Sequence, residues 1–105
     1  MAWFLLVVAG LLEVIWAFSM KRSEGFTKLT PSLVTLIAMI ASFALLARAM
    51  RDLPLGTAYT IWTGIGAVGA FVLGIVALGE QATPMRIIAA TLIVGGLVLM
   101  KLSEG

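Results

Sequence analysis

Apolar residues fill four long stretches of the chain, and short polar segments separate them. The stretches cover roughly residues 2–20, 32–50, 57–78 and 85–102, and each is close to the ~20 residues that an α-helix needs to cross a bilayer. None of them alternates apolar and polar residues with a period of two, so spanning β-strands are not expected. The pattern therefore predicts an all-α integral membrane protein, in which residues 1–105 form a single domain of four transmembrane helices per subunit.

The polar segments between the spans carry residues that end and begin helices. They read KRSEGFTK, RDLPLGT and GEQATPMR, and each combines charge with glycine or proline. Pro31, Pro54 and Pro84 lie at span starts, where the missing N–H does no harm. Thr30 and Thr83, which precede two of these prolines, are expected to act as N-cap residues.

The composition agrees with lipid as the surrounding medium. Of the 105 residues, 62% are hydrophobic and only 11% are charged, which is unlike a soluble domain. The sequence has no cysteine and no histidine, so disulfides, thiolate or imidazole zinc sites and histidine acid–base catalysis are excluded. We expect no metal ion or other cofactor. The chain also offers no nucleophile–base pair, so we do not expect an enzyme.

The first apolar stretch is expected to be a permanent span. A signal peptide has a basic segment before its apolar run and small residues at a cleavage site. This stretch has neither, and it carries an acid, Glu13, in its middle. We therefore expect it to remain on the mature protein.

Basic residues are divided almost evenly between the two ends of the spans. Lysine and arginine normally concentrate in cytoplasmic loops, so an even division gives a weak orientation signal. We expect copies of the chain to insert in both orientations and to pair as an antiparallel, dual-topology homodimer; a single orientation is the alternative. The basic residues form no continuous patch, so nucleic-acid binding is not expected. Lys21, Arg22, Lys28 and Arg86 lie on one side, and Arg48, Arg51 and Lys101 lie on the other.

Glu13 is the only charged side chain between the amino terminus and Lys21. A carboxylate at the centre of a span costs ~2.5–3.5 kcal/mol on insertion scales, so such residues usually face a bundle interior or a watery cavity. Gly10 and Ala17 share its helix face, and these small residues would leave room beside the acid for a ligand or a close helix, with Gly10 lining the site. Trp16 lies beside Glu13 with a flat surface suited to a cation. An acid in low dielectric can switch between neutral and charged forms near neutral pH. This predicts a site that exchanges protons for cations; the alternative is a protonated acid that only hydrogen-bonds a neighbouring helix.

Other polar and aromatic residues in the second and third spans extend this candidate site. Tyr59 and Trp62 project from one side of the third span. For Tyr59, near the start of the span, a place in the aromatic belt at the membrane surface is the alternative. Ser42 lies in the second span, where a hydroxyl often bonds only its own helix.

Small residues in the third and fourth spans predict helix contacts and bending. Gly64, Gly66 and Gly69 satisfy the G-x-G-x-x-G pattern, but that fingerprint has meaning only between a strand and a helix. Inside a membrane span these glycines favour close helix approach and a conformational hinge. Thr91 and Gly95 lie one helical turn apart and predict a dimer interface in the fourth span, with a lipid-facing helix as the alternative.

Two segments and the four short spans resemble the small multidrug resistance transporters over essentially the whole chain. The segments are AGLLEVIWAFSMKRSEGFTK and LPLGTAYTIWTGIGA. The resemblance implies an antiparallel homodimer of four-helix subunits that exports cations in exchange for protons. It also implies that this exchange depends on Glu13.

Residues 13–17, EVIWA, are similar to the E-V-x-W-A pattern of the guanidinium exporters in that family. The polyspecific quaternary-ammonium exporters tend to have glycine where this chain has Trp16. The resemblance implies that Glu13 pairs with guanidinium and that Ser42 and Trp16 orient Glu13 by hydrogen bonding. It also implies that Tyr59 and Trp62 line the site.

The chemistry of the substrate agrees with this assignment. Guanidinium is planar, its N–H groups form a fork that fits a carboxylate, and its faces stack on aromatic rings. The sequence therefore predicts a proton-coupled antiporter of the bacterial inner membrane that exports guanidinium or small substituted guanidinium cations by alternating access. Two alternatives stay open. One is a polyspecific quaternary ammonium or multidrug exporter of the same family; the other is a non-transporting scaffold or one subunit of a heterodimer.

Overall fold

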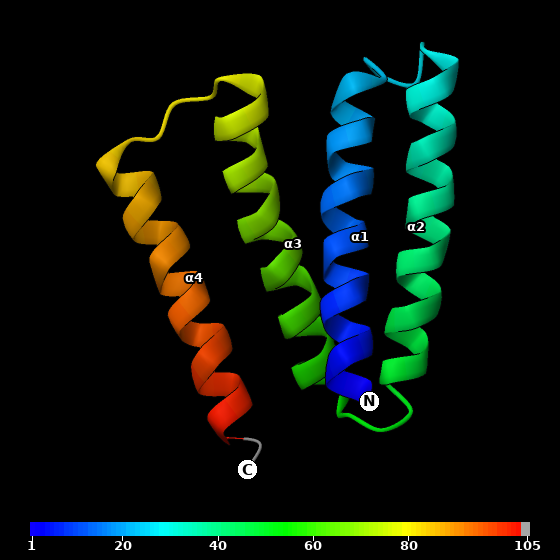
Figure 1. Ribbon diagram of the computed structural model, residues 1–105. Coiled ribbons are helices and arrows are strands. Elements are labelled where there is room, and N and C mark those ends of the chain that lie inside the picture. The colour runs from blue at the N-terminus through cyan, green and yellow to red at the C-terminus, as the bar shows by residue number, and fades with distance from the viewer. Residues whose placement is uncertain (104–105) are drawn as a thin grey trace.

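The computed structural model describes residues 1–103, which form four α-helices. α1 spans Ala2–Arg22, α2 spans Leu29–Ala49, α3 spans Leu55–Leu78 and α4 spans Pro84–Ser103. All four are long and apolar enough to cross a membrane, which confirms the predicted all-helical, four-span architecture. Successive helices run in opposite directions, with the α1–α2 and α3–α4 connections at one end of the molecule and the α2–α3 connection at the other (Figure 1).

The start of α2 differs from the prediction. The helix begins at Leu29, and Lys28 is its extended N-cap residue. Ser32 N donates to the Lys28 carbonyl, so Thr30 and Pro31 lie inside the first turn. The prediction that Thr30 caps this helix is therefore wrong. Proline is tolerated at this place because N–H groups of a first turn have no partner within the helix.

The corresponding prediction for α4 is confirmed. Thr83 Oγ1 accepts a hydrogen bond of 3.2 Å from Arg86 N. This bond satisfies one of the free N–H groups at the start of the helix.

The turn between α1 and α2 is held together by Ser23, which is fully buried. Ser23 Oγ donates to the Met20 carbonyl at 2.7 Å and accepts from Phe26 N at 3.0 Å. On the surface of the same turn, Lys28 Nζ lies 2.6 Å from a Glu24 carboxyl oxygen. The hydrogen bond from Lys28, together with its charge, lowers the pKa of Glu24. Glu24 is therefore a charged surface group at neutral pH.

The four helices form one flat layer, with α1 between α2 and α3 (Figure 1). α4 lies at the edge and packs mainly against α3. The molecule measures 43 × 34 × 16 Å, and a helix with its side chains is about 10–12 Å across, so the layer is one helix thick. No residue of α4 is buried. Much of the apolar surface of the single chain is therefore left to lipid or to another chain.

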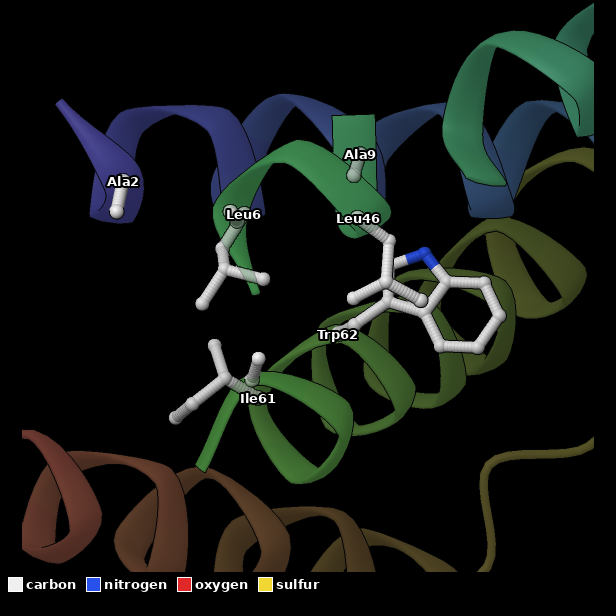
Figure 2. Packing of buried hydrophobic residues seen from close by; sticks show 8 residues of the cluster. Ala2, Leu6, Ala9, Leu46, Ile61 and Trp62 are labelled. Atoms are coloured by element: carbon white, nitrogen blue, oxygen red, sulfur yellow. The ribbon is translucent and has the colours of Figure 1, made fainter. Parts of the chain in front are cut away.

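The core lies near the amino-terminal end of α1, where three helices meet. It consists mainly of small and aliphatic residues, which let the helix backbones approach closely. Figure 2 shows Trp62 of α3 beside Leu46, with its indole nitrogen pointing toward α1. The buried cluster is formed by Ala2, Leu6, Ala9, Leu46, Ala49, Ala58, Ile61 and Trp62.

Candidate functional site

Glu13 lies on the face of α1 that packs against α3. Its carboxyl group lies directly over Gly66, where an added Cβ would overlap both the carboxyl carbon and Oε1. Oε1 is buried, and within residues 1–103 no hydrogen bond reaches it. A buried polar atom without a partner is costly. A proton or a cationic donor would therefore be stabilised at this oxygen.

Ser42 and Trp62 form a buried hydrogen-bond chain that ends on α1. Trp62 Nε1 donates to Ser42 Oγ at 2.9 Å, and Ser42 Oγ donates to the Ala9 carbonyl at 2.7 Å. Ser42 thus bonds a neighbouring helix and not its own. Ala9 precedes Glu13 by one helical turn. These two hydrogen bonds therefore hold α2 and α3 against the part of α1 that carries the acid.

Aromatic side chains from three helices lie in contact beside these hydrogen bonds. The Trp16 and Phe43 rings are 6.4 Å apart in an edge-on arrangement, and the Phe43 and Trp62 rings are 5.6 Å apart. Tyr59, which is 53% exposed, lies 5.6 Å from the Trp62 ring. Sequence reasoning did not identify Phe43, because a phenylalanine in an apolar span carries no distinguishing signal. The contact with Trp16 and Trp62 makes it part of the candidate site.

The hydrogen bonds expected from Ser42 and Trp16 to Glu13 are not formed in the single chain. The Ser42 hydroxyl donates to Ala9, and Trp16 Nε1 is buried without a partner within the described residues. Trp16 Nε1 and Glu13 Oε1, which both lack a partner in the described part of the chain, belong to neighbouring turns of α1. The orienting roles of Ser42 and Trp16 remain predictions.

The predicted site and hinge glycines are all places of close helix contact. Gly66 alone among them faces Glu13, so the room beside the acid comes from α3. The space beside Gly10 is filled by a side chain of α3, and α3 runs through its glycines as one helix. The hinge role is a separate prediction about motion. The remaining contacts pair Gly10 with Ile65, Gly64 with Leu97, and Gly69 with Val14.

Thr91 and Gly95 lie on α4, away from the Glu13 site. Thr91 Oγ1 donates to the Ile87 carbonyl of its own helix at 2.8 Å. A Cβ added to Gly95 would meet no atom within 4 Å. Both residues are thus on the helix that leaves most surface open to another chain, and their role in a dimer remains a prediction.

Replacing Ser42 should weaken the contact between the three packed helices. Ser42→Ala removes the bond to Ala9 and leaves the buried Trp62 Nε1 without an acceptor, which we expect to lower the free energy of unfolding by about 1–2 kcal/mol. Ser32→Ala is the control, because that exposed hydroxyl bonds only the Lys28 carbonyl of its own turn. SDS-induced unfolding of both variants in mixed micelles measures the difference. Equal stability of the two variants would contradict a stabilising role for the buried hydrogen bonds of Ser42.

Comparisons of the sequence with known proteins all indicate the same family of membrane transporters. The model of the family described as Small Multidrug Resistance protein matches residues 1–93. The guanidinium exporter of Escherichia coli strain K12 is 60% identical over 103 residues, which cover 98% of each chain. The guanidinium exporters of Citrobacter freundii and Salmonella typhimurium are each 57% identical over 103 residues, again 98% of both chains.

Proposed function

The chain belongs to the Small Multidrug Resistance family, and from this premise we propose that it exports guanidinium or a small substituted guanidinium cation in exchange for protons. One observation carries the proposal: the buried Oε1 of Glu13 has no hydrogen-bond partner among residues 1–103 and lies in an apolar span against Gly66. The similarity to named guanidinium exporters over nearly the whole chain gives the substrate class. As a multi-pass membrane protein of a bacterial type, it would act in the inner membrane.

Exchange follows from one acid that holds one positive charge at a time. With a proton bound, Glu13 is neutral and suits its apolar surroundings. With guanidinium bound, the carboxylate is neutralised by two parallel charge-assisted hydrogen bonds. Because an unpaired carboxylate at this depth is costly, each cation displaces the other. A proton gradient would then drive export of the organic cation.

Directional bonding favours guanidinium over bulky quaternary ammonium ions. Glu13 supplies acceptors for a fork of N–H groups. The rings of Trp16 and Trp62, which both contact Phe43, would supply faces for stacking. In this proposal Ser42 and Trp16 turn to hydrogen-bond Glu13 when the substrate is bound, and Tyr59 lines the approach. Trp16 also fills space that a larger ligand would need.

A second copy in the opposite orientation would complete the site. A layer one helix thick cannot enclose a ligand on both faces. α4, with no buried residue, is the natural surface for pairing, and Thr91 and Gly95 would lie in that interface. The nearly equal numbers of basic residues on the two sides favour insertion in both orientations.

Alternating access would then require part of the bundle to move. We assign the bend to Gly64, Gly66 and Gly69, where α3 touches its neighbours through glycine. A bend there would shift the α3 wall of the site, because Gly66 itself contacts the Glu13 carboxyl. The cation would thus be exposed to one side of the membrane at a time.

Substrate choice provides the test. We expect purified protein in liposomes to show proton flux coupled to guanidinium, and at least about tenfold weaker apparent affinity for tetrapropylammonium. The physical reason is that tetrapropylammonium has no N–H group, so each lost charge-assisted hydrogen bond costs about 1.5–3 kcal/mol. Fluorescence recordings of a pH-sensitive dye inside the liposomes measure this for both substrates.

The same recordings separate the rival functions. A preference for tetrapropylammonium would favour a polyspecific quaternary ammonium exporter. No proton flux with either cation from the purified single chain would contradict homodimeric transport and favour a scaffold or a heterodimer subunit.

A further inference from the structure

At the end of α3, the carboxyl group of Glu80 is held in a defined position. The helix ends at Gly79, whose φ of 69° is left-handed, and Glu80 N then donates to the Gly74 carbonyl at 3.1 Å. The chain therefore turns back on itself, as glycine caps allow. A Cβ at Gly74 would overlap Glu80 Oε1. The absence of a side chain at Gly74 thus gives the carboxyl group its place against the helix.

This carboxyl group stands at the mouth of a cavity of about 210 Å³ between the ends of α1 and α3. Ala17 and Ala70 line the inner part of the cavity, and Lys21 lines its outer part with Glu80. The volume admits several water molecules, since each occupies about 30 Å³ of liquid. The cavity is therefore large enough for a small hydrated cation.

The cavity lies on the same helix seam as the Glu13 carboxyl. Ala17 follows Glu13 by one turn on the same face of α1, and Ala70 follows Gly66 by one turn on the same face of α3. Along either helix, the mouth is about 12 Å from the level of Glu13 at a rise of 1.5 Å per residue. The inner wall of the cavity thus ends one turn from the acid.

We propose that this cavity is a vestibule through which small organic cations such as guanidinium reach Glu13, and that Glu80 captures them at its mouth. The inference rests on the proposed function and adds a second, surface-level cation site to it. Glu80 is exposed to water, and a fixed carboxylate raises the local concentration of cations. It also offsets the positive charge of Lys21 in the same cavity.

The test is the guanidinium dependence of the initial transport rate for Glu80→Gln in liposomes. We expect the KM for guanidinium to rise about 3–10-fold at low ionic strength, at the lower end of the range for charge-lined clefts. The difference should shrink in 0.5 M salt, where the Debye length falls to a few ångströms (about 3 Å at 1 M). The kcat should be unchanged, because capture precedes the exchange at Glu13.

Glu24→Gln is the matched control. It removes one carboxylate from the same end of the molecule, at a surface turn outside the cavity. Both changes leave the basic residues intact, and acidic residues contribute little to topology, so orientation in the membrane stays equal. A similar KM for the two variants, whether raised or unchanged, would overturn the proposal that Glu80 captures cations at the mouth of a vestibule. If wild-type protein does not transport guanidinium, the proposed function fails; transport with an unaltered Glu80→Gln variant rejects only this inference.

Discussion

Liposomes that contain the Glu13→Gln variant are expected to show no guanidinium flux driven by a proton gradient. Glutamine has nearly the same shape and fits against Gly66, so the fold should persist. It cannot release a proton in the accessible pH range, and its neutral amide cannot form an ion pair with guanidinium. We therefore expect loss of both binding and coupled transport, down to the level of protein-free liposomes.

Two measurements make this result interpretable. Size-exclusion chromatography and far-ultraviolet circular dichroism should show an intact helical protein, and Glu24→Gln should transport as the wild type does. Coupled transport retained by folded Glu13→Gln would contradict the exchange mechanism. It would leave the acid with only a structural role.

Gly66→Ala should be nearly as damaging, although it adds a single methyl group. The new Cβ would occupy the space of the Glu13 carboxyl group, so the acid must move or the two helices must separate. Displacement of a reacting group by about 1 Å can lower a rate about 100-fold, and we expect a loss of this order in guanidinium transport. Alanine also favours helix over glycine, so the variant should not unfold for reasons of propensity.

Another glycine of α3, outside the proposed hinge, provides the control. Gly56→Ala would meet no atom within 4 Å and should be close to wild type. Equal transport rates for Gly66→Ala and Gly56→Ala would contradict the tight fit of Glu13 against α3.

Hydropathy made the four helices predictable, because their length and composition are properties of single segments. The importance of Glu13 was predictable for the same reason: an acid in an apolar run is costly wherever it lies. The partner of each residue was harder to predict. Ser42 bonds Ala9 on another helix. This pairing depends on the relative rotation and shift of α1 and α2, and no residue pattern in either helix indicates it.

The same limit applies to the small and aromatic residues. The sequence placed room for a ligand beside Gly10, but that space is filled by Ile65, and the glycine facing Glu13 is Gly66. Phe43 looked like any lipid-facing side chain until its contacts with Trp16 and Trp62 were seen. Thr30 failed as a helix cap because the turn at Ser23 lets α2 begin at Leu29.

The bond from Trp62 to Ser42, and from Ser42 to Ala9, determines which half of α3 is anchored. Without bound substrate it fastens the amino-terminal half of this helix to its two neighbours, and the proposed hinge glycines begin just after it at Gly64. Any bend at these glycines would leave Trp62 in place and move the carboxy-terminal half of α3 as a rigid body. This half carries Gly66, which touches Glu13, and leads to Glu80 at the water surface. One bend would therefore change the surroundings of both acids on the proposed cation route at the same time.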